Sequence, residues 1–271
     1  MKLYLSGILC LGIMFCQAQV LHPHRSTTYT ATVTYSRLQA DAFSFRNNPA
    51  ALAWLQKPVF GFTGEQPYLL PDLTSGAFSA VLPMGSSRFG FLLEHAGGRQ
   101  QHQSGGSLSF AQVLGKKASL GASFHYQSLG VAGYGAFGMP GVGLGGCLLL
   151  TSELQAGFQL FRGIGNIGGI NGERLAAKYD FGLGYDLSPE FFFSAVLSAN
   201  EGVPPEVQAA CSYRFSGKLH SRLGVHTGTG LFFVGGGYKM GELQIDAFTS
   251  LHPRLGFSPG LQVSFKPAER K

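Results

Sequence analysis

The turns of this chain alternate in length between Val59 and Phe265. Every second turn is short and polar, whereas the turns between them are mostly longer and rich in glycine or proline. The short turns lie at 83–86, 115–117, 151–153, 188–190, 216–218 and 240–242, and the longer ones at 64–72, 97–106, 131–141, 162–172, 200–205 and 252–254. Short turns at one end and longer loops at the other are typical of a closed β-barrel that spans a membrane.

About fourteen antiparallel strands fit between these turns. We expect them near 59–64, 74–82, 87–96, 105–114, 117–128, 141–151, 153–162, 174–187, 190–199, 206–216, 218–227, 231–240, 242–251 and 255–266. Most are close to the ~9–11 residues that cross a bilayer at a tilt of ~45°. An even count places both ends of the barrel beside the short turns, which are periplasmic in bacterial barrels. The predicted fold class is therefore all-β, a closed transmembrane barrel.

Side chains alternate between two kinds along several of these segments. Within 177–187 the large residues are Tyr179, Phe181, Leu183, Tyr185 and Leu187, and the intervening ones are Lys178, Asp180, Gly182, Gly184 and Asp186. Successive side chains of a strand point to opposite faces of the sheet. Large apolar residues on one face and small or polar ones on the other indicate lipid outside the barrel and a narrow, filled, polar lumen inside.

The composition agrees with a strand-built membrane protein. Charged residues make up 13% of the chain, about half the usual share of a soluble domain. After the N-terminus no apolar run reaches the ~18 residues of a spanning helix. The net charge of +6 is spread thinly, and no basic stretch is longer than Lys116-Lys117. We therefore expect no nucleic-acid partner.

The first 18 residues are typical of a secretory signal peptide. Lys2 supplies the positive start, Leu3 to Phe15 form a short apolar stretch, and Cys16-Gln17-Ala18 offers a cleavage site. An alternative is a lipoprotein acylated on Cys16, which the bulky Phe15 fits poorly. We divide the rest into an N-terminal periplasmic or plug segment (19–57), the barrel (58–266) and a tail (267–271).

The N-terminal segment contains one helix signal and one strand signal. Residues 27–35 could form a short strand. Asn48 suits a helix N-cap and Pro49 the first helical position, so we expect a short helix at 49–56 in or under the barrel mouth. Trp54 would anchor this helix, either in the lumen or at the interfacial belt of the membrane.

The segment SFRNNPAALAW, followed directly by a strand, resembles the Asn-Pro-Ala signature of FadL-like outer-membrane barrels. The resemblance is closest to the PorV-type branch of bacteria with type IX secretion. Its positions in this chain are Asn48, Pro49, Ala50 and Leu52, and Asn47 and Trp54 belong to the same plug motif. The resemblance implies a barrel of about fourteen strands in the bacterial outer membrane, with an N-terminal plug and both termini in the periplasm. FadL-type transporters have much larger outer loops than the ~3–11 residues here, which argues against a dedicated lipid-uptake pocket.

Motifs for enzymatic chemistry are weak. A GxGxxG string at 163–168 continues into more glycine and cannot open the helix of a dinucleotide site, so we assign it to an outer loop. The eight histidines have no metal-ligand spacing on a helix. Cys147 and Cys211 lie in separate strands and fit small hydrophobic positions. We predict no catalytic, metal or cofactor site and no enzyme activity.

Nine charged residues fall on the predicted inward face. Five are basic and four acidic: Arg88, Glu94, Lys178, Asp180, Asp186, Arg214, Arg222, Lys239 and Asp246. Unpaired charges would be costly in a narrow lumen, so near balance predicts ion pairs across the lumen. A path for protons or ions is the alternative. A ring of one sign, which would favour an ion-selective pore, is absent from this set.

Two functions fit this sequence. The first is a non-enzymatic accessory or scaffold subunit of an outer-membrane complex that secretes, inserts or attaches proteins, with lipid and other outer-membrane proteins as partners. The alternative is FadL-like passage of a hydrophobic small molecule, motivated by the Asn48-Pro49 plug and by glycine-rich strands where the wall could kink. The short loops favour the first, and the sequence does not decide whether a ligand enters.

Overall fold

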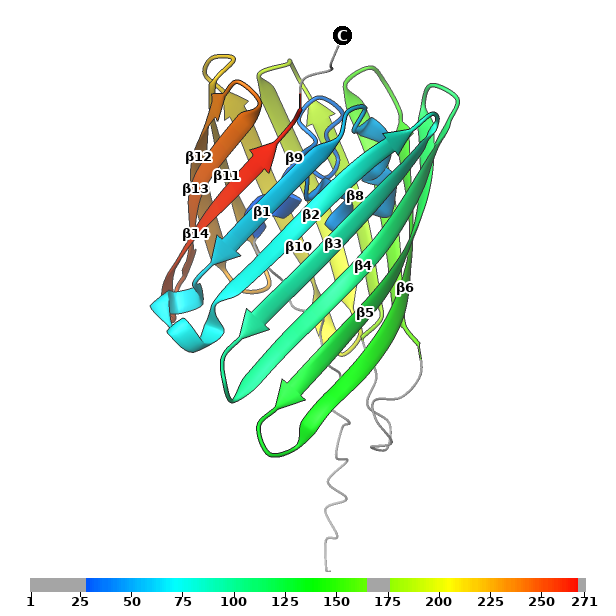
Figure 1. Ribbon diagram of the computed structural model, residues 1–271. Helices are drawn as coiled ribbons and strands as arrows, with labels where there is room; N and C mark the ends of the chain where they lie inside the picture. Colours follow the sequence, from blue (N-terminus) through cyan, green and yellow to red (C-terminus); the bar gives the residue numbers. More distant parts are fainter. Residues whose placement is uncertain (1–27, 165–175, 268–271) are drawn as a thin grey trace, which may run out of the picture.

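A computed structural model of the protein describes residues 28–164 and 176–267, which form one closed barrel (Figure 1). The predicted signal peptide and most of the GxGxxG loop lie outside the described residues. Fourteen strands make the wall: β1 (Val59–Glu65), β2 (Ser75–Met84), β3 (Ser87–Gly97), β4 (Gln101–Leu114), β5 (Ala118–Val131), β6 (Gly135–Leu149), β7 (Leu154–Gly163), β8 (Lys178–Asp186), β9 (Phe191–Asn200), β10 (Val203–Arg214), β11 (Leu219–His226), β12 (Leu231–Met240), β13 (Leu243–His252) and β14 (Gly256–Phe265).

Every strand pairs antiparallel with its neighbours in sequence, and β1 closes the barrel by pairing with β14. In that closing pair Phe60 lies opposite Phe265 and Gly64 lies opposite Leu261. The predicted class and strand count are confirmed. The described residues contain no helix long and apolar enough to cross a membrane.

Two of the predicted long loops are wrong. Strands β4, β5 and β6 have 14, 14 and 15 residues, so only 98–100 and 132–134 remain as turns where we expected 97–106 and 131–141. Glycine permits this extension, because its missing side chain leaves room for large neighbours on the same face. A Cβ on Gly130 would collide with the ring of His102, and one on Gly138 with the ring of Tyr126.

Residues 28–57 lie inside the barrel, near the short turns (Figure 1), and we call them the plug. The plug contains α1 (Thr28–Ala31), η1 (Ser44–Arg46) and η2 (Pro49–Trp54). The strand expected at 27–35 is absent over its described part, because each barrel strand is already paired on both sides and no edge is free. Instead the backbone turns on itself, with Thr34 N donating to Ala31 O at 3.2 Å.

The predicted helix at 49–56 is shorter and tighter than expected. It is a 3₁₀ helix that ends at Trp54, because Leu55 already has extended dihedrals (φ −86, ψ 98). The amide of Leu55 donates to the carbonyl of Leu52 at 3.0 Å, which closes the last turn. A 3₁₀ helix is the usual form of so short a helical piece.

Candidate functional site

The plug packs into the barrel through a continuous apolar cluster. Phe43, Phe45 and Leu52 are fully buried and contact the wall residues Val81 and Leu92. Large buried side chains each contribute roughly 1.5–3 kcal/mol relative to exposure. The plug is therefore an integral part of the folded barrel.

Eight inward glycines make room for the plug, and we call them the glycine cradle. They are Gly61, Gly90, Gly121, Gly145, Gly157, Gly182, Gly184 and Gly235. A Cβ on Gly61 would lie 2.7 Å from the Cβ of Ala42, and one on Gly121 would lie 2.5 Å from the backbone nitrogen of Ala50. Packed interiors have no room for such overlap. The cradle explains much of the glycine on the inner face, which we had attributed to kinking of the wall.

The plug motif lies at the centre of this packing. Asn48 is fully buried, and its Oδ1 accepts a hydrogen bond from the amide of Ala50 at 3.0 Å. Its Nδ2 donates to the carbonyls of Phe158 (3.1 Å) and Gly146 (3.3 Å), so one side chain caps η2 and ties it to β6 and β7. The other motif residues surround it: Pro49, Ala50 and Leu52 are buried, and Asn47 and Trp54 are half-buried. Trp54 packs inside the barrel. Of its two predicted locations, the lumen and the interfacial belt of the membrane, it therefore occupies the lumen.

Replacing Asn48 by alanine is expected to loosen the plug. The change removes the cap and leaves the carbonyls of Gly146 and Phe158 without this donor, at a cost of roughly 1–3 kcal/mol. Thermal unfolding in detergent measures the loss. Asn48→Asp, which keeps the cap oxygen but loses the donor, should fall between alanine and the wild type. An unchanged midpoint for Asn48→Ala would contradict this role.

A buried charge cluster joins the plug to β11 and β13. Arg222 Nη1 lies 3.0 Å from Asp41 Oδ2, and both side chains are almost fully buried. Tyr29 donates its hydroxyl to Asp246 Oδ1 at 3.1 Å, and His220 Nε2 lies 2.5 Å from the same oxygen. The Arg222 guanidinium also sits 4.9 Å from the centre of the Tyr29 ring. Burial raises the pKa of Tyr29 above its ordinary value, so the phenol remains a neutral donor.

Two further predicted lumen carboxylates also hold the plug. Glu94 pairs with Arg46 at 2.5 Å. Asp186 accepts hydrogen bonds from the hydroxyl of Ser36 (2.6 Å) and the amide of Arg37 (3.0 Å). The plug therefore supplies the partners of carboxylates on both β3 and β8.

The remaining predicted lumen charges are at the short-turn end or pair locally. Arg88 donates to the carbonyl of Leu55 at 3.0 Å, and Arg214 to that of Leu38 at 3.4 Å. Lys239 is exposed. Lys178 and Asp180, at 2.6 Å, are neighbours on one strand and form the one ion pair among the nine that the described residues contain. The prediction of pairing across the lumen is therefore wrong, because the plug lies between the opposing walls and provides the partners.

The sequence interpretation missed several large apolar residues that face inward. Phe233 and Phe248 form a cluster with Tyr29, whose ring stacks on Phe248 at 4.7 Å. Met139 and Phe161 form another. For Phe161, Phe233 and Phe248 the signal was present, since each occupies an inward position in an expected strand, whereas Met139 lies in the loop expected at 131–141. These clusters give the lumen apolar surfaces beside its polar ones.

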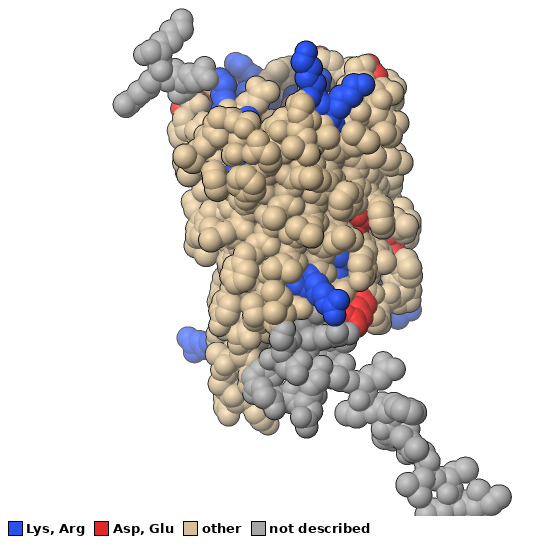
Figure 2. Space-filling model, turned by 90° about the vertical axis from the view of Figure 1, so that its right-hand side faces the viewer, with Lys and Arg blue, Asp and Glu red and all other residues tan. Residues whose placement is uncertain are grey.

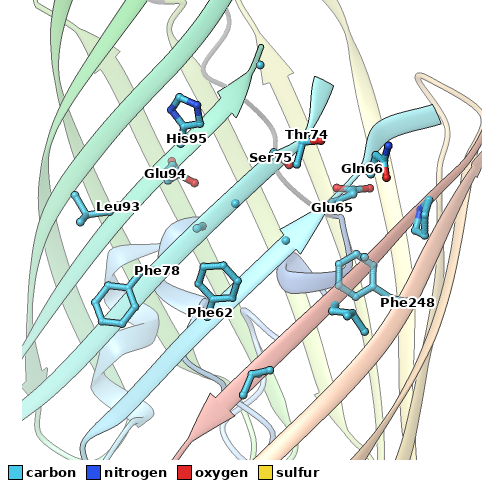
Figure 3. Close-up of a pocket in the computed structure, with 18 of the residues that line it drawn as sticks. Phe62, Glu65, Gln66, Thr74, Ser75, Phe78, Leu93, Glu94, His95 and Phe248 are labelled. Atoms are coloured by element: carbon cyan, nitrogen blue, oxygen red, sulfur yellow. The ribbon is translucent and has the colours of Figure 1, made fainter. Parts of the chain in front are cut away.

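A groove of about 1240 Å³ lies on the wall over β13, β14, β1, β2, β3 and β4 (Figure 3). Its apolar walls come from outward side chains, namely Phe62, Phe78, Leu93, Leu261 and Val263. Gly64 and Gly76 also line it and lie opposite each other in the β1–β2 pair. A Cβ on Gly64 would be 3.7 Å from its nearest neighbour and one on Gly76 3.5 Å, so the space outside them is open. The inward residues Glu94 and Phe248 also line the groove, so its lining includes side chains from both faces of the wall.

A strained apolar loop borders the groove. It consists of η3 (Pro67–Leu69) and η4 (Pro71–Leu73), and we call it the leucine lip. Tyr68 and Leu69 have φ of 56° and 59°, a left-handed conformation that costs energy for residues other than glycine. Leu69 and Leu70 are 58% and 51% exposed. The lip extends the apolar surface of the groove toward the end of the barrel opposite the short turns.

Other chemistry is sparse in the part of the chain that the structure describes. That part contains no group of three His, Cys, Asp or Glu side chains placed to hold a metal ion. Cys147 and Cys211 are free thiols, the first buried and the second half-buried.

No protein-family model matches the chain, and a comparison with curated proteins finds no match. Several solved structures are similar. The CymD monoaromatic hydrocarbon channel is 12% identical, with a TM-score of 0.61 over 85% of this chain and 94% of that one. A FadL homologue of Pseudomonas aeruginosa is 15% identical, with a TM-score of 0.61 over 90% and 98%. The toluene transporter TodX of Pseudomonas putida is 13% identical, with a TM-score of 0.59 over 92% and 98%.

Identities this low show a shared fold and no more. Of these three structures, one is described as a hydrocarbon channel, one as a toluene transporter and one as a FadL homologue, and none is described as part of a secretion machine. These matches agree with the fold that the resemblance to FadL-like barrels implied. They do not support the closer resemblance to the PorV-type branch. The chain therefore has the closed, fourteen-stranded, plugged-barrel fold of the FadL type.

Proposed function

We propose that the protein is a non-enzymatic barrel of the bacterial outer membrane that passes a small hydrophobic molecule through its side wall. The wall groove carries this proposal, because its lining combines apolar outward side chains with the inward residues Glu94 and Phe248. The similarity to hydrocarbon channels supports the same class of ligand. This was the alternative of our two sequence hypotheses, and it is now better supported than the accessory subunit.

The plug favours a lateral route over an axial one. The glycine cradle and the Arg222–Asp41 pair fix the plug across the short-turn part of the lumen. A molecule that followed the barrel axis would have to displace all of these contacts. A route through the groove leaves them in place.

The chemistry of the groove favours neutral apolar ligands. Its walls are aromatic and aliphatic, and apolar contact contributes about 25 cal/mol per Å² of surface removed from water. On the lumen side Phe248 stacks with Tyr29 and continues the apolar surface inward. Moving a charged group along such a surface would carry a large desolvation cost.

In the proposed orientation the short turns and both chain ends are periplasmic.

Filling the groove is expected to block passage. Gly64→Leu/Gly76→Leu places two isobutyl groups in open space, so the barrel should still fold. The entry of radiolabelled toluene into cells that carry this variant should fall about tenfold, toward the rate of cells without the protein. The matched control is Gly236→Leu. Gly236 is also an outward glycine but lies on β12, away from the groove, and a Cβ added to it would lie 3.4 Å from its nearest neighbour. Equal uptake by the double variant and the wild type would overturn the route, and wild-type uptake no faster than that of empty cells would overturn the function.

The accessory-subunit hypothesis makes a different prediction. A tagged copy drawn from native membranes would then carry a stoichiometric partner protein. A monomeric barrel with normal toluene entry would support the transport function.

A further inference from the structure

Basic side chains gather at the short-turn end of the barrel. In the described residues this end carries Arg37, Lys57, Arg88, Lys116, Lys117, Arg214, Lys218, Lys239 and Lys266, against the exposed carboxylates of Glu153, Glu190 and Glu242. Figure 2 shows Lys and Arg along the upper edge of the molecule. We call these nine cations the basic rim.

The opposite end has no such excess. Its described charges outside the Lys178–Asp180 pair are Arg99, Arg162 and Arg254 against Glu65, Asp72, Glu201 and Glu206. The sequence hid this asymmetry, because the cations occur one or two to a turn and form no run. The fold brings every second turn to the same end and so concentrates them.

Part of the basic rim is used inside the protein, and part is not. Arg88, Arg214 and Lys266 donate to carbonyl oxygens of the plug, the last to Ala40 at 3.4 Å. The side chains of Lys116, Lys117, Lys218 and Lys239 are exposed, and no carboxylate of the described residues lies within ion-pair distance of them. These four ammonium groups are available to a partner.

The height of these lysines on the barrel favours a lipid partner. Lys116 and Lys117 follow the exposed outward Leu114 by two and three residues, and Lys218 directly precedes the exposed Leu219. The apolar outer surface ends at these leucines, so the ammonium groups lie where lipid headgroups begin. Because the turns are short, they place the charges at this level instead of projecting them beyond it.

We propose that the basic rim binds the phosphate groups of anionic phospholipids in the leaflet beside the short turns. Anionic headgroups attract lysine and arginine held near the membrane surface. A rim of several separate cations matches many small mobile anions better than one folded partner. The proposal depends on the membrane placement and not on what crosses the wall, so a failed toluene experiment would leave it standing.

Native mass spectrometry of the full chain tests this inference. The protein is incubated in detergent with equal amounts of phosphatidylglycerol and phosphatidylcholine that carry the same acyl chains. We expect the wild type to retain phosphatidylglycerol about fivefold over phosphatidylcholine, and Lys116→Gln/Lys117→Gln/Lys218→Gln, which leaves Lys239, to lose most of that preference. Arg99→Gln/Arg254→Gln removes two exposed cations from the opposite end and should keep the preference. The heat-dependent gel shift of a folded barrel verifies each variant.

Three results would overturn the proposal. One is equal retention of the two lipids by the wild type. Another is the same preference in the triple glutamine variant, which would place the lipid elsewhere. A third is loss of the preference in Arg99→Gln/Arg254→Gln. If the wild type shows no lipid preference but binds polyglutamate and the triple variant does not, the rim belongs to an acidic protein partner.

Discussion

Replacing Gly121 by alanine is expected to displace the η2 part of the plug while the barrel remains folded. The added Cβ would lie 2.5 Å from both the backbone nitrogen of Ala50 and the backbone carbonyl carbon of Pro49. Neither is the end of a flexible side chain, so the whole η2 segment would have to move. Overpacking of this kind costs about 1–3 kcal/mol or more, which is comparable to the burial of one large side chain such as Leu52.

Trypsin measures the release directly. Arg46 is half-buried and paired with Glu94 in the seated plug, so a cut after Arg46 reports displacement. We expect rapid cleavage there in Gly121→Ala, together with a large rise in single-channel conductance in planar bilayers. Gly236→Ala adds the same methyl group to an outward glycine and should behave as the wild type. Unchanged protection of Arg46 in Gly121→Ala would show that the cradle does not hold the plug.

Replacing Arg222 by glutamine is expected to destabilise the protein by about 3–5 kcal/mol. The change leaves Asp41 buried without its cation and removes a charge that also lies over the Tyr29 ring. An uncompensated buried charge is far more costly than the loss of the attraction alone. Denaturant unfolding in detergent gives the free energy.

A double variant separates the ion pair from general damage to the lumen. Arg222→Met/Asp41→Met replaces both charges with apolar side chains and should recover most of the stability, since paired hydrophobic replacement is often neutral. If the double variant were as unstable as Arg222→Gln, packing around these positions and not the unpaired carboxylate would account for the loss.

The fold was predictable because its signals are local. Turn length and two-residue alternation depend on residues close in sequence, and they gave all fourteen strands. The errors at 97–106 and 131–141 arose because glycine is read as a loop signal. In β5 and β6 glycine instead leaves space for rings from neighbouring strands, Gly130 for His102 and Gly138 for Tyr126.

The site was less predictable because its contacts are distant in sequence. The alternation correctly placed Arg222 and Asp246 inside the barrel, but their partners Asp41 and Tyr29 belong to a segment about 180 or more residues away. No spacing rule joins them. The wall groove depends in the same way on closure, which brings β14 beside β1 and sets Leu261 opposite Gly64.

The glycine cradle makes the plug and the wall a single fitted pair. Each cradle glycine leaves space for a particular part of the plug. Gly235, for example, leaves space for the ring of Tyr29, and Gly90 for the ring of Phe45. A plug transplanted from another barrel of this fold would bring its bulk to other places and meet side chains there. Substitutions in the two parts therefore have to arise together, and an engineered exchange of plugs has to carry the matching glycines with it.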